Sequence, residues 1–301
     1  MTRDPRPVHE LSLDRYTLRD LGDLEAERPR LALASGRAEV IERGARFVQR
    51  MAREDRHVYG VNTGFGSLCE TRIEPDQIEQ LQRNLVLSHA CGVGEIVAES
   101  ISRLTLLIKL LTFRTGHTGI SIDTVSRLLD FWNHDLIPAI PKKGTVGASG
   151  DLAPLAHLAL PLLGLGRVHR DGEIVDGGEA LAALGWQPLV LQAKEGLALT
   201  NGVQYINAFA VQCVLAIGEL IAAAEVIAAI SIQAYSASRT FYDPLYHRTS
   251  YHRERQRVAA NLSQLLAGSN HFELETCNRS QQDPYSLRCI PQVHGAVRQA
   301  H

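Results

Sequence analysis

A long run without proline at residues 204–236 limits most strongly what this chain can fold into. The run is rich in alanine and strongly apolar, and its length alone would allow it to cross a membrane. Glu219 and Glu225 interrupt it, however, and no excess of basic residues flanks it. Because alanine side chains let helices approach closely, the run predicts a buried helix of a helical bundle.

The rest of the chain also predicts mainly α structure. Apolar residues spaced three and four apart, with charges between them, predict amphipathic helices at residues 38–54, 74–88 and 99–114. Asp171-Gly172 between β-prone residues predicts a short hairpin at residues 166–175. We therefore expect a mainly α fold, with an α-rich domain carrying small β hairpins at residues 1–200 and the start of a long-helix bundle at residues 201–301.

Composition and charge narrow the function classes. The net charge of −2 gives no basis for binding nucleic acid or an anionic membrane. The N-terminus lacks the apolar core of a signal peptide. Five cysteines show neither CxxC spacing nor paired histidine ligands: Cys69, Cys91, Cys213, Cys277 and Cys289. We expect a cytoplasmic protein with reduced thiols and without a bound metal or nucleotide.

Residues 144–155 contain a tripeptide, Ala148-Ser149-Gly150, that can become an electrophile. Attack of the Gly150 amide nitrogen on the Ala148 carbonyl carbon would close a five-membered ring with loss of one water. Loss of the Ser149 hydroxyl as a second water would leave an exocyclic methylidene, giving 4-methylideneimidazole-5-one. Gly147 and Gly150 supply the backbone freedom that this cyclisation needs.

An ordinary helix start is the alternative interpretation of this segment. Ser149 or Asp151 would then be an N-cap, with Pro154 in the first helical turn, and both interpretations can hold together. The whole run at residues 144–155 closely resembles the signature of the histidine and aromatic amino acid ammonia-lyases, whose members form this electrophile autocatalytically. The resemblance implies that the first domain carries this prosthetic group.

A glycine-rich loop at residues 59–66 resembles the catalytic-tyrosine loop of the same family. A tyrosine hydroxyl acts as a base only when nearby dipoles or cations favour its ionised form. The resemblance implies that Tyr59 removes a proton from the substrate. By itself, the loop would equally suit a packed aromatic ring beside glycines that shape a turn.

The pair Ser88-His89 lies where a helix is expected to end. It resembles histidine-selective members of the family, whereas tyrosine-selective relatives carry His-Leu and phenylalanine-selective ones carry Phe-Leu. The resemblance implies that His89 lies near the substrate side chain and that the substrate is an imidazole. A single histidine of this kind would otherwise be a hydrogen-bonded structural residue.

Two further segments, which begin at Lys194 and Gln282, complete the match. By the resemblance, Asn201 positions the electrophile and the substrate, Arg288 binds the substrate carboxylate, and Gln282 and Tyr285 line the site. A guanidinium suits a carboxylate because it offers two parallel charge-assisted hydrogen bonds. Without the family pattern, each residue would be a cap, a surface ion-pair partner or part of the core.

The resemblance implies elimination of ammonia from L-histidine to give trans-urocanate, in a homotetramer with shared active sites. A tyrosine or phenylalanine lyase or aminomutase, and a non-catalytic truncated homologue, are the alternatives. Family members are considerably longer, with a C-terminal half that extends the bundle and adds site residues, whereas this sequence ends at His301. A smaller departure is His252-Arg-Glu-Arg in place of the usual His-Pro-Gly-Gln.

Overall fold

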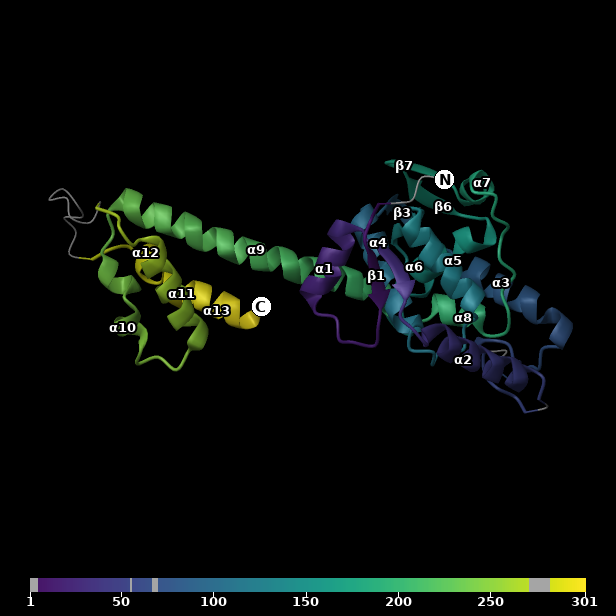
Figure 1. Cartoon of the computed structure of the whole chain (residues 1–301). Coiled ribbons are helices and arrows are strands. Elements are labelled where there is room, and N and C mark those ends of the chain that lie inside the picture. Colours follow the sequence, from purple (N-terminus) through teal and green to yellow (C-terminus); the bar gives the residue numbers. More distant parts are fainter. Residues whose placement is uncertain (1–4, 55, 67–69, 271–281) are drawn as a thin grey trace. The chain divides into compact units, whose positions relative to one another are not determined.

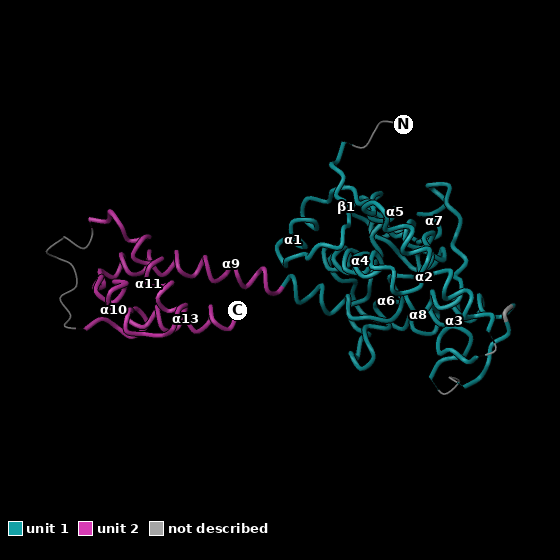
Figure 2. Tube along the Cα trace, turned by 60° about the horizontal axis from the view of Figure 1, so that its bottom comes forward, with its two compact units in different colours: residues 1–212 teal, residues 213–301 magenta. Residues whose placement is uncertain are grey.

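The computed structural model describes residues 5–54, 56–66, 70–270 and 282–301 (Figure 1). The chain divides into two compact units, residues 1–212 and residues 213–301 (Figure 2). The long helix α9, Gln204–Tyr235, contributes to both units. We describe each unit by itself.

Helices dominate the first unit, which confirms the mainly α expectation. Its α-helices are α1 Leu18–Glu27, α2 Arg37–Ala52, α3 Ile78–His89, α4 Glu99–Phe113, α5 Ile122–Asn133, α6 Leu152–Ala159, α7 Gly177–Ala183 and α8 Glu195–Thr200. Two short 3₁₀ helices accompany them, η2 Pro75–Gln77 and η3 Leu160–Leu163. Helix α4 lies at the centre of the core, since most of its side chains are buried. The predicted helices at 38–54, 74–88 and 99–114 correspond to α2, to η2 with α3, and to α4.

Side-chain caps fix where several of these helices begin. Before α1, the Thr17 hydroxyl accepts from the Asp20 backbone nitrogen at 3.2 Å, and the Asp20 carboxylate accepts from the Thr17 nitrogen at 2.7 Å. This reciprocal arrangement is a capping box. Ser121 and Asp176 cap α5 and α7 with side-chain oxygens that accept from backbone nitrogens of the first turn.

The strands form three small sheets around the helices. Their bounds are β1 Val8–Leu11, β2 Arg30–Leu33, β3 Val93–Ile96, β4 Ile137–Pro138, β5 Pro141–Lys143, β6 Arg167–Arg170 and β7 Glu173–Asp176. Strands β1 and β2 pair parallel, β3 and β5 antiparallel, and β4, β6 and β7 form an antiparallel sheet in that order. The β6–β7 hairpin confirms the prediction, and its turn residues Asp171 and Gly172 both have positive φ, 52° and 83°.

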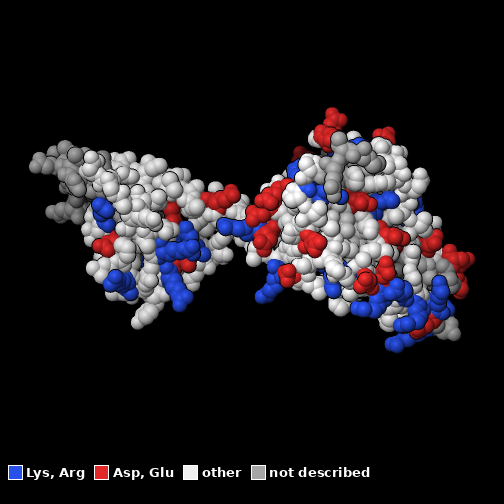
Figure 3. Space-filling model, viewed as in Figure 1, with Lys and Arg blue, Asp and Glu red and all other residues white. Residues whose placement is uncertain are grey.

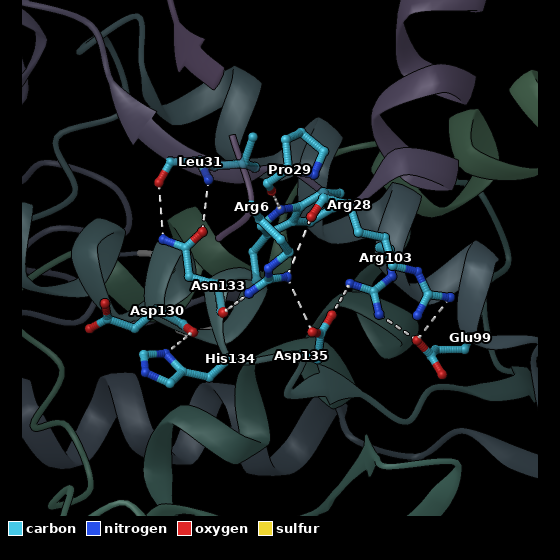
Figure 4. Close-up of polar contacts among 11 residues, drawn as sticks. Arg6, Arg28, Pro29, Leu31, Glu99, Arg103, Asp130, Asn133, His134 and Asp135 are labelled. Atoms are coloured by element: carbon cyan, nitrogen blue, oxygen red, sulfur yellow. Dashed lines mark hydrogen bonds and ion pairs between the residues drawn. The ribbon is translucent and has the colours of Figure 1, made fainter. Parts of the chain in front are cut away.

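A buried arginine joins the β1–β2 layer to the helical core (Figure 4). Arg103 of α4 is fully buried and binds Asp135 at 2.9 Å as well as Glu99. Its guanidinium lies 5.4 Å from the centre of the Trp132 ring. The Trp132 indole nitrogen donates to the Pro29 carbonyl oxygen at 2.7 Å, so one cluster connects α4, α5 and the start of β2.

The second unit packs four short helices and a 3₁₀ turn on the C-terminal part of α9. These are η4 Arg239–Tyr242, α10 Pro244–His247, α11 Arg253–Leu265, α12 Tyr285–Arg288 and α13 Ile290–Ala300. Ile232, Tyr242, Val258 and Leu262 form the centre of its core. The buried Glu225 of α9 accepts from Asn261 at 2.9 Å and binds Arg298, which ties α9 to α11 and α13. His252 caps α11 with its ring nitrogen.

The predicted helix at residues 204–236 is confirmed as α9. The helix was predicted to be buried, but several of its apolar side chains are exposed in this chain. Within the second unit, Leu220, Ile227 and Ile230 are 68%, 62% and 60% exposed. The surface over this part of α9 is mostly uncharged in Figure 3. Among the residues that the structure describes, the core that α9 forms with α11 does not include these three side chains, which remain exposed. By length and composition alone, α9 would suffice to cross a membrane.

Candidate active site

The tripeptide lies in the loop that connects β5 to α6. Ala148 and Ser149 are exposed, whereas Gly150 is buried. Gly150 has a φ of +110°, and a Cβ atom there would lie 2.5 Å from the Gly202 carbonyl oxygen. Only glycine fits this position, because a side chain would meet both backbone strain and backbone atoms. The tripeptide therefore packs directly against the turn that follows α8.

Asp151 anchors the C-terminal end of this loop. Its backbone nitrogen donates to the Gly202 oxygen at 2.7 Å. Its buried carboxylate accepts from the Thr145 hydroxyl and from the Ile206 backbone nitrogen, both at 2.9 Å. Ile206 lies in the first turn of α9, where free amide groups favour a negative charge. Asp151 stands at the N-cap position of α6 without capping it, and its side chain caps α9 instead.

Asn201 contacts the same loop, and Lys109 contacts Asn201 in turn. Asn201 ends α8, and its Nδ2 donates to the Ser149 carbonyl oxygen at 3.3 Å. The Asn201 carbonyl oxygen accepts from Nζ of the buried Lys109 at 2.8 Å. Burial lowers the pKa of Lys109 to about 7, against the opposing effect of the Asp151 charge. Lys109 was not among the predicted site residues. The feature that could have indicated it is a charged residue within the apolar stretch of α4.

The loop that carries Tyr59 packs against α8. A Cβ atom on Gly60, whose φ is +70°, would lie 2.4 Å from the Leu197 side chain. The buried Asn62 holds the loop in shape through hydrogen bonds between its amide and backbone groups at the start of the loop. The Tyr59 ring is 57% exposed and meets the Phe65 ring edge-on at 6.0 Å. Its hydroxyl is therefore carried at the surface of this unit.

The geometry of His89 defines its tautomer. His89 ends α3, and its Nδ1 lies 2.8 Å from the Leu85 carbonyl oxygen and 3.1 Å from the Ser88 hydroxyl. Because a carbonyl oxygen only accepts, Nδ1 carries a proton and the neutral ring keeps Nε2 as an acceptor.

A second histidine ties the loop after His89 to the helix after the tripeptide. The Gly92 backbone nitrogen donates to Nε2 of His157, on α6, at 3.0 Å. Burial, together with the charge of Arg167, lowers the pKa of His157. The neutral ring is the form that can accept this hydrogen bond.

The other predicted site residues belong to the second unit: Gln282, Tyr285 and Arg288. The Arg288 guanidinium lies 4.4 Å from the Tyr285 ring centre and 5.7 Å from that of Phe241. Within the described part of the chain, its buried Nε has no hydrogen-bond acceptor. Aromatic rings thus hold the guanidinium in place and leave this donor available.

The structure brings together part of the predicted site within the first unit. Asn201 touches the tripeptide directly, and α3, α6 and α8 contact one another, so His89 and the tripeptide are carried by packed elements. Among the described residues, no group of three or more His, Cys, Asp or Glu side chains could hold a metal ion. Cys91, Cys213 and Cys289 are free thiols, and Cys69 and Cys277 lie outside the described residues.

A family model of the aromatic amino acid lyases matches residues 16–301. The chain belongs to the aromatic amino acid lyase family. The chain is 44% identical to histidine ammonia-lyase of Vibrio vulnificus over 270 residues, which are 89% of this chain and 53% of that protein. It therefore spans about half the length of the curated relatives it matches.

Solved structures share the fold of this chain. Histidine ammonia-lyase from Trypanosoma cruzi matches with a TM-score of 0.83 and 34% identity, over 96% of this chain and 53% of that one. Ergothionase from Treponema denticola, an ergothioneine-degrading enzyme, matches with a TM-score of 0.91 and 26% identity, over 97% and 59%. These likenesses confirm the resemblance first indicated by the tripeptide segment and the mainly α fold.

Proposed function

We propose that this lyase eliminates ammonia from L-histidine to give trans-urocanate, using 4-methylideneimidazole-5-one formed from Ala148, Ser149 and Gly150. Similarity to histidine ammonia-lyases supports the reaction class and substrate. The observation that carries the proposal is the packing of the Asn201–Gly202 turn on the tripeptide, with Asn201 Nδ2 on the Ser149 oxygen and Gly150 against Gly202.

The residues fit the chemistry that the ring requires. A C–N bond forms between Gly150 N and Ala148 C, and the Ala148 oxygen leaves as water with the amide protons of Gly150 and Ser149. The Ser149 hydroxyl then leaves with the Cα proton as a second water, so no oxidant is needed. Ala148 has a small side chain, Gly150 has none, and the loop is exposed at Ser149. Each of these features leaves room for the closure.

Asn201 tunes the electrophile in this proposal. When formed, the group supplies an electrophilic carbon that captures the substrate and improves the amine as a leaving group. The Ser149 carbonyl becomes the ring carbonyl, conjugated with the exocyclic carbon. A donor on that oxygen withdraws electron density from the exocyclic carbon. The Asn201 amide already donates to this oxygen.

Tyr59 and His89 act on the substrate side chain. The proton to be removed is on the β-carbon, which is weakly acidic because no carbonyl is adjacent. The phenolate oxygen of Tyr59 accepts it in this proposal. Its exposed position on a fixed loop suits contact with a bound substrate. With the proton on Nδ1, Nε2 of His89 is an acceptor that suits the N–H of a substrate imidazole.

Arg288 binds the substrate carboxylate, with Gln282 and Tyr285 beside it. Its planar guanidinium is held over the Tyr285 ring and suits a carboxylate better than an ammonium would. The nearby Asp283 is buried and accepts from the Ser238 backbone nitrogen at 2.7 Å, which anchors the segment before α12. The segment thus presents the guanidinium from a fixed base.

Assembly completes the enzyme. We propose a cytoplasmic homotetramer with shared active sites, in which other subunits cover the exposed apolar side chains of α9 such as Leu220, Ile227 and Ile230. No metal, nucleic acid or membrane takes part in this proposal.

The test compares substrates on the intact protein. L-histidine, L-tyrosine and L-phenylalanine are supplied separately, and the products are identified by chromatography alongside the release of ammonia. We expect trans-urocanate from histidine and little conversion of the other two. A preference for tyrosine or phenylalanine, or a β-amino acid as the product, would replace this proposal by the alternative lyase or aminomutase.

A further inference from the structure

A buried lysine remains without a role in the proposed reaction. Lys109 is buried in the C-terminal half of α4, a helix whose side chains are mostly buried. Burying an ammonium is costly unless the group is paired and hydrogen-bonded. This costly group donates a hydrogen bond to Asn201, whose amide contacts the tripeptide, so its position points to a role in that contact.

Lys109 donates a hydrogen bond to the turn that Asn201 and Gly202 form after α8. Its Nζ donates to the Asn201 carbonyl oxygen at 2.8 Å and lies 5.2 Å from the Phe113 ring centre. The carboxylate of Asp151 is the negative charge that favours the protonated amine. Lys109 therefore reaches the loop through Asn201 and does not touch the tripeptide itself.

The tripeptide packs against this Asn201–Gly202 turn. The next carbonyl oxygen, that of Gly202, accepts from the Asp151 nitrogen at 2.7 Å. The same oxygen is the atom that a Cβ on Gly150 would meet at 2.5 Å. If the Asn201–Gly202 turn were free to shift, it would no longer hold Gly150 in this close contact.

We propose that Lys109 is a positioning residue for ring closure, which holds the Asn201–Gly202 turn against Gly150. The turn keeps Gly150 N folded toward the Ala148 carbonyl carbon, so that the C–N bond forms as the first water leaves. It also keeps the Asn201 amide on the Ser149 oxygen. This inference rests on one part of the proposed function, the cyclisation of the tripeptide. The role of Lys109 does not depend on which substrate the enzyme takes.

Lys194 offers a matched control. Its Nζ also donates to a backbone carbonyl oxygen, that of Thr118 at 2.7 Å, and burial lowers its pKa as well. Thr118 precedes α5 and is not part of the tripeptide loop. Replacing either lysine by methionine removes the donor and the charge and keeps a side chain of similar length.

The experiment follows closure by mass in the intact protein. Wild type, Lys109→Met and Lys194→Met are sampled at intervals after synthesis is stopped, and the folded fraction is isolated by size exclusion and digested. The fraction of the tripeptide peptide that lacks two waters gives the closure rate. We expect Lys109→Met to close at least tenfold more slowly than wild type, and Lys194→Met to close at the wild-type rate. Equal rates in all three proteins, or equal slowing in both variants, would overturn the proposal.

The readouts separate this inference from the proposed function. A wild-type peptide of unmodified mass contradicts the proposed prosthetic group, whereas equal closure rates in wild type and in Lys109→Met contradict only the role of Lys109. If Lys109→Met gives no folded protein, Lys109→Gln is measured in the same way. Slow closure in its folded fraction supports the proposal, and wild-type closure overturns it.

Discussion

The carboxylate of Asp151 accepts a hydrogen bond from the Ile206 backbone nitrogen at 2.9 Å, across 55 positions in the sequence. The residue directly after the tripeptide thus caps the long helix α9. The same carboxylate accepts from Thr145 on the other side of the loop. One buried acid therefore fixes both the start of α9 and the loop in which the ring would form.

Replacing Asp151 by alanine should destabilise the first unit by about 3 kcal/mol, because two buried hydrogen bonds to a charged group are lost. Thr145→Val removes one of those two contacts and should cost about 1 kcal/mol. Denaturant unfolding of both variants measures the free energies. A loss in Asp151→Ala no larger than in Thr145→Val would show that the contact with Ile206 contributes nothing.

Removing the Tyr59 hydroxyl should leave the fold and the ring intact and slow turnover. We expect Tyr59→Phe to lower kcat by about 100- to 10,000-fold, the range for loss of a positioned general base. Because the side chain of Tyr59 is mostly exposed, the melting temperature of the variant should stay close to that of the wild-type protein. Tyr251→Phe, at another exposed tyrosine, is the control and should keep full activity. Near-normal turnover in Tyr59→Phe would contradict its assignment as the base.

Stability should fall as the pH drops through the range in which His157 becomes protonated. Burial and the Arg167 charge lower the pKa of His157 in the folded protein, whereas an unfolded histidine titrates near 6.5. The unfolded chain therefore binds more protons at mildly acidic pH, so this contribution is complete above pH 6.5 and is lost as the pH falls through the folded pKa.

The variant His157→Gln isolates this contribution, because glutamine can accept from Gly92 but does not titrate. Unfolding free energies measured between pH 5 and 8 should decline less steeply on the acidic side for the variant than for wild type. Identical slopes in the two proteins would contradict this account of His157.

Local patterns predicted much of this fold. The apolar spacing in α2, α3 and α4 depends on helix geometry alone, and the Asp171-Gly172 turn depends on two residues that tolerate positive φ. The tripeptide chemistry also follows from three adjacent residues. Such features are determined within a few positions of the chain, so the sequence displays them directly.

Contacts between distant segments could not be predicted in this way. Nothing near Lys109 in the sequence indicates Asn201, and nothing near Asp151 indicates Ile206, because packing of α4, α6, α8 and α9 brings them together. The exposure of α9 was misjudged for a related reason. The apolar composition of α9 indicates that the helix favours apolar surroundings. Which of its faces are covered depends on the helices that pack against it.

The mass of the proteolytic peptide that contains Ala148, Ser149 and Gly150 tests the central claim most directly, since it reports cyclisation and dehydration independently of substrate. The account predicts a deficit of two waters in the wild-type protein, and at most one in Ser149→Ala, which has no hydroxyl to lose as the second water and cannot form the methylidene. A wild-type peptide of unmodified mass would contradict it.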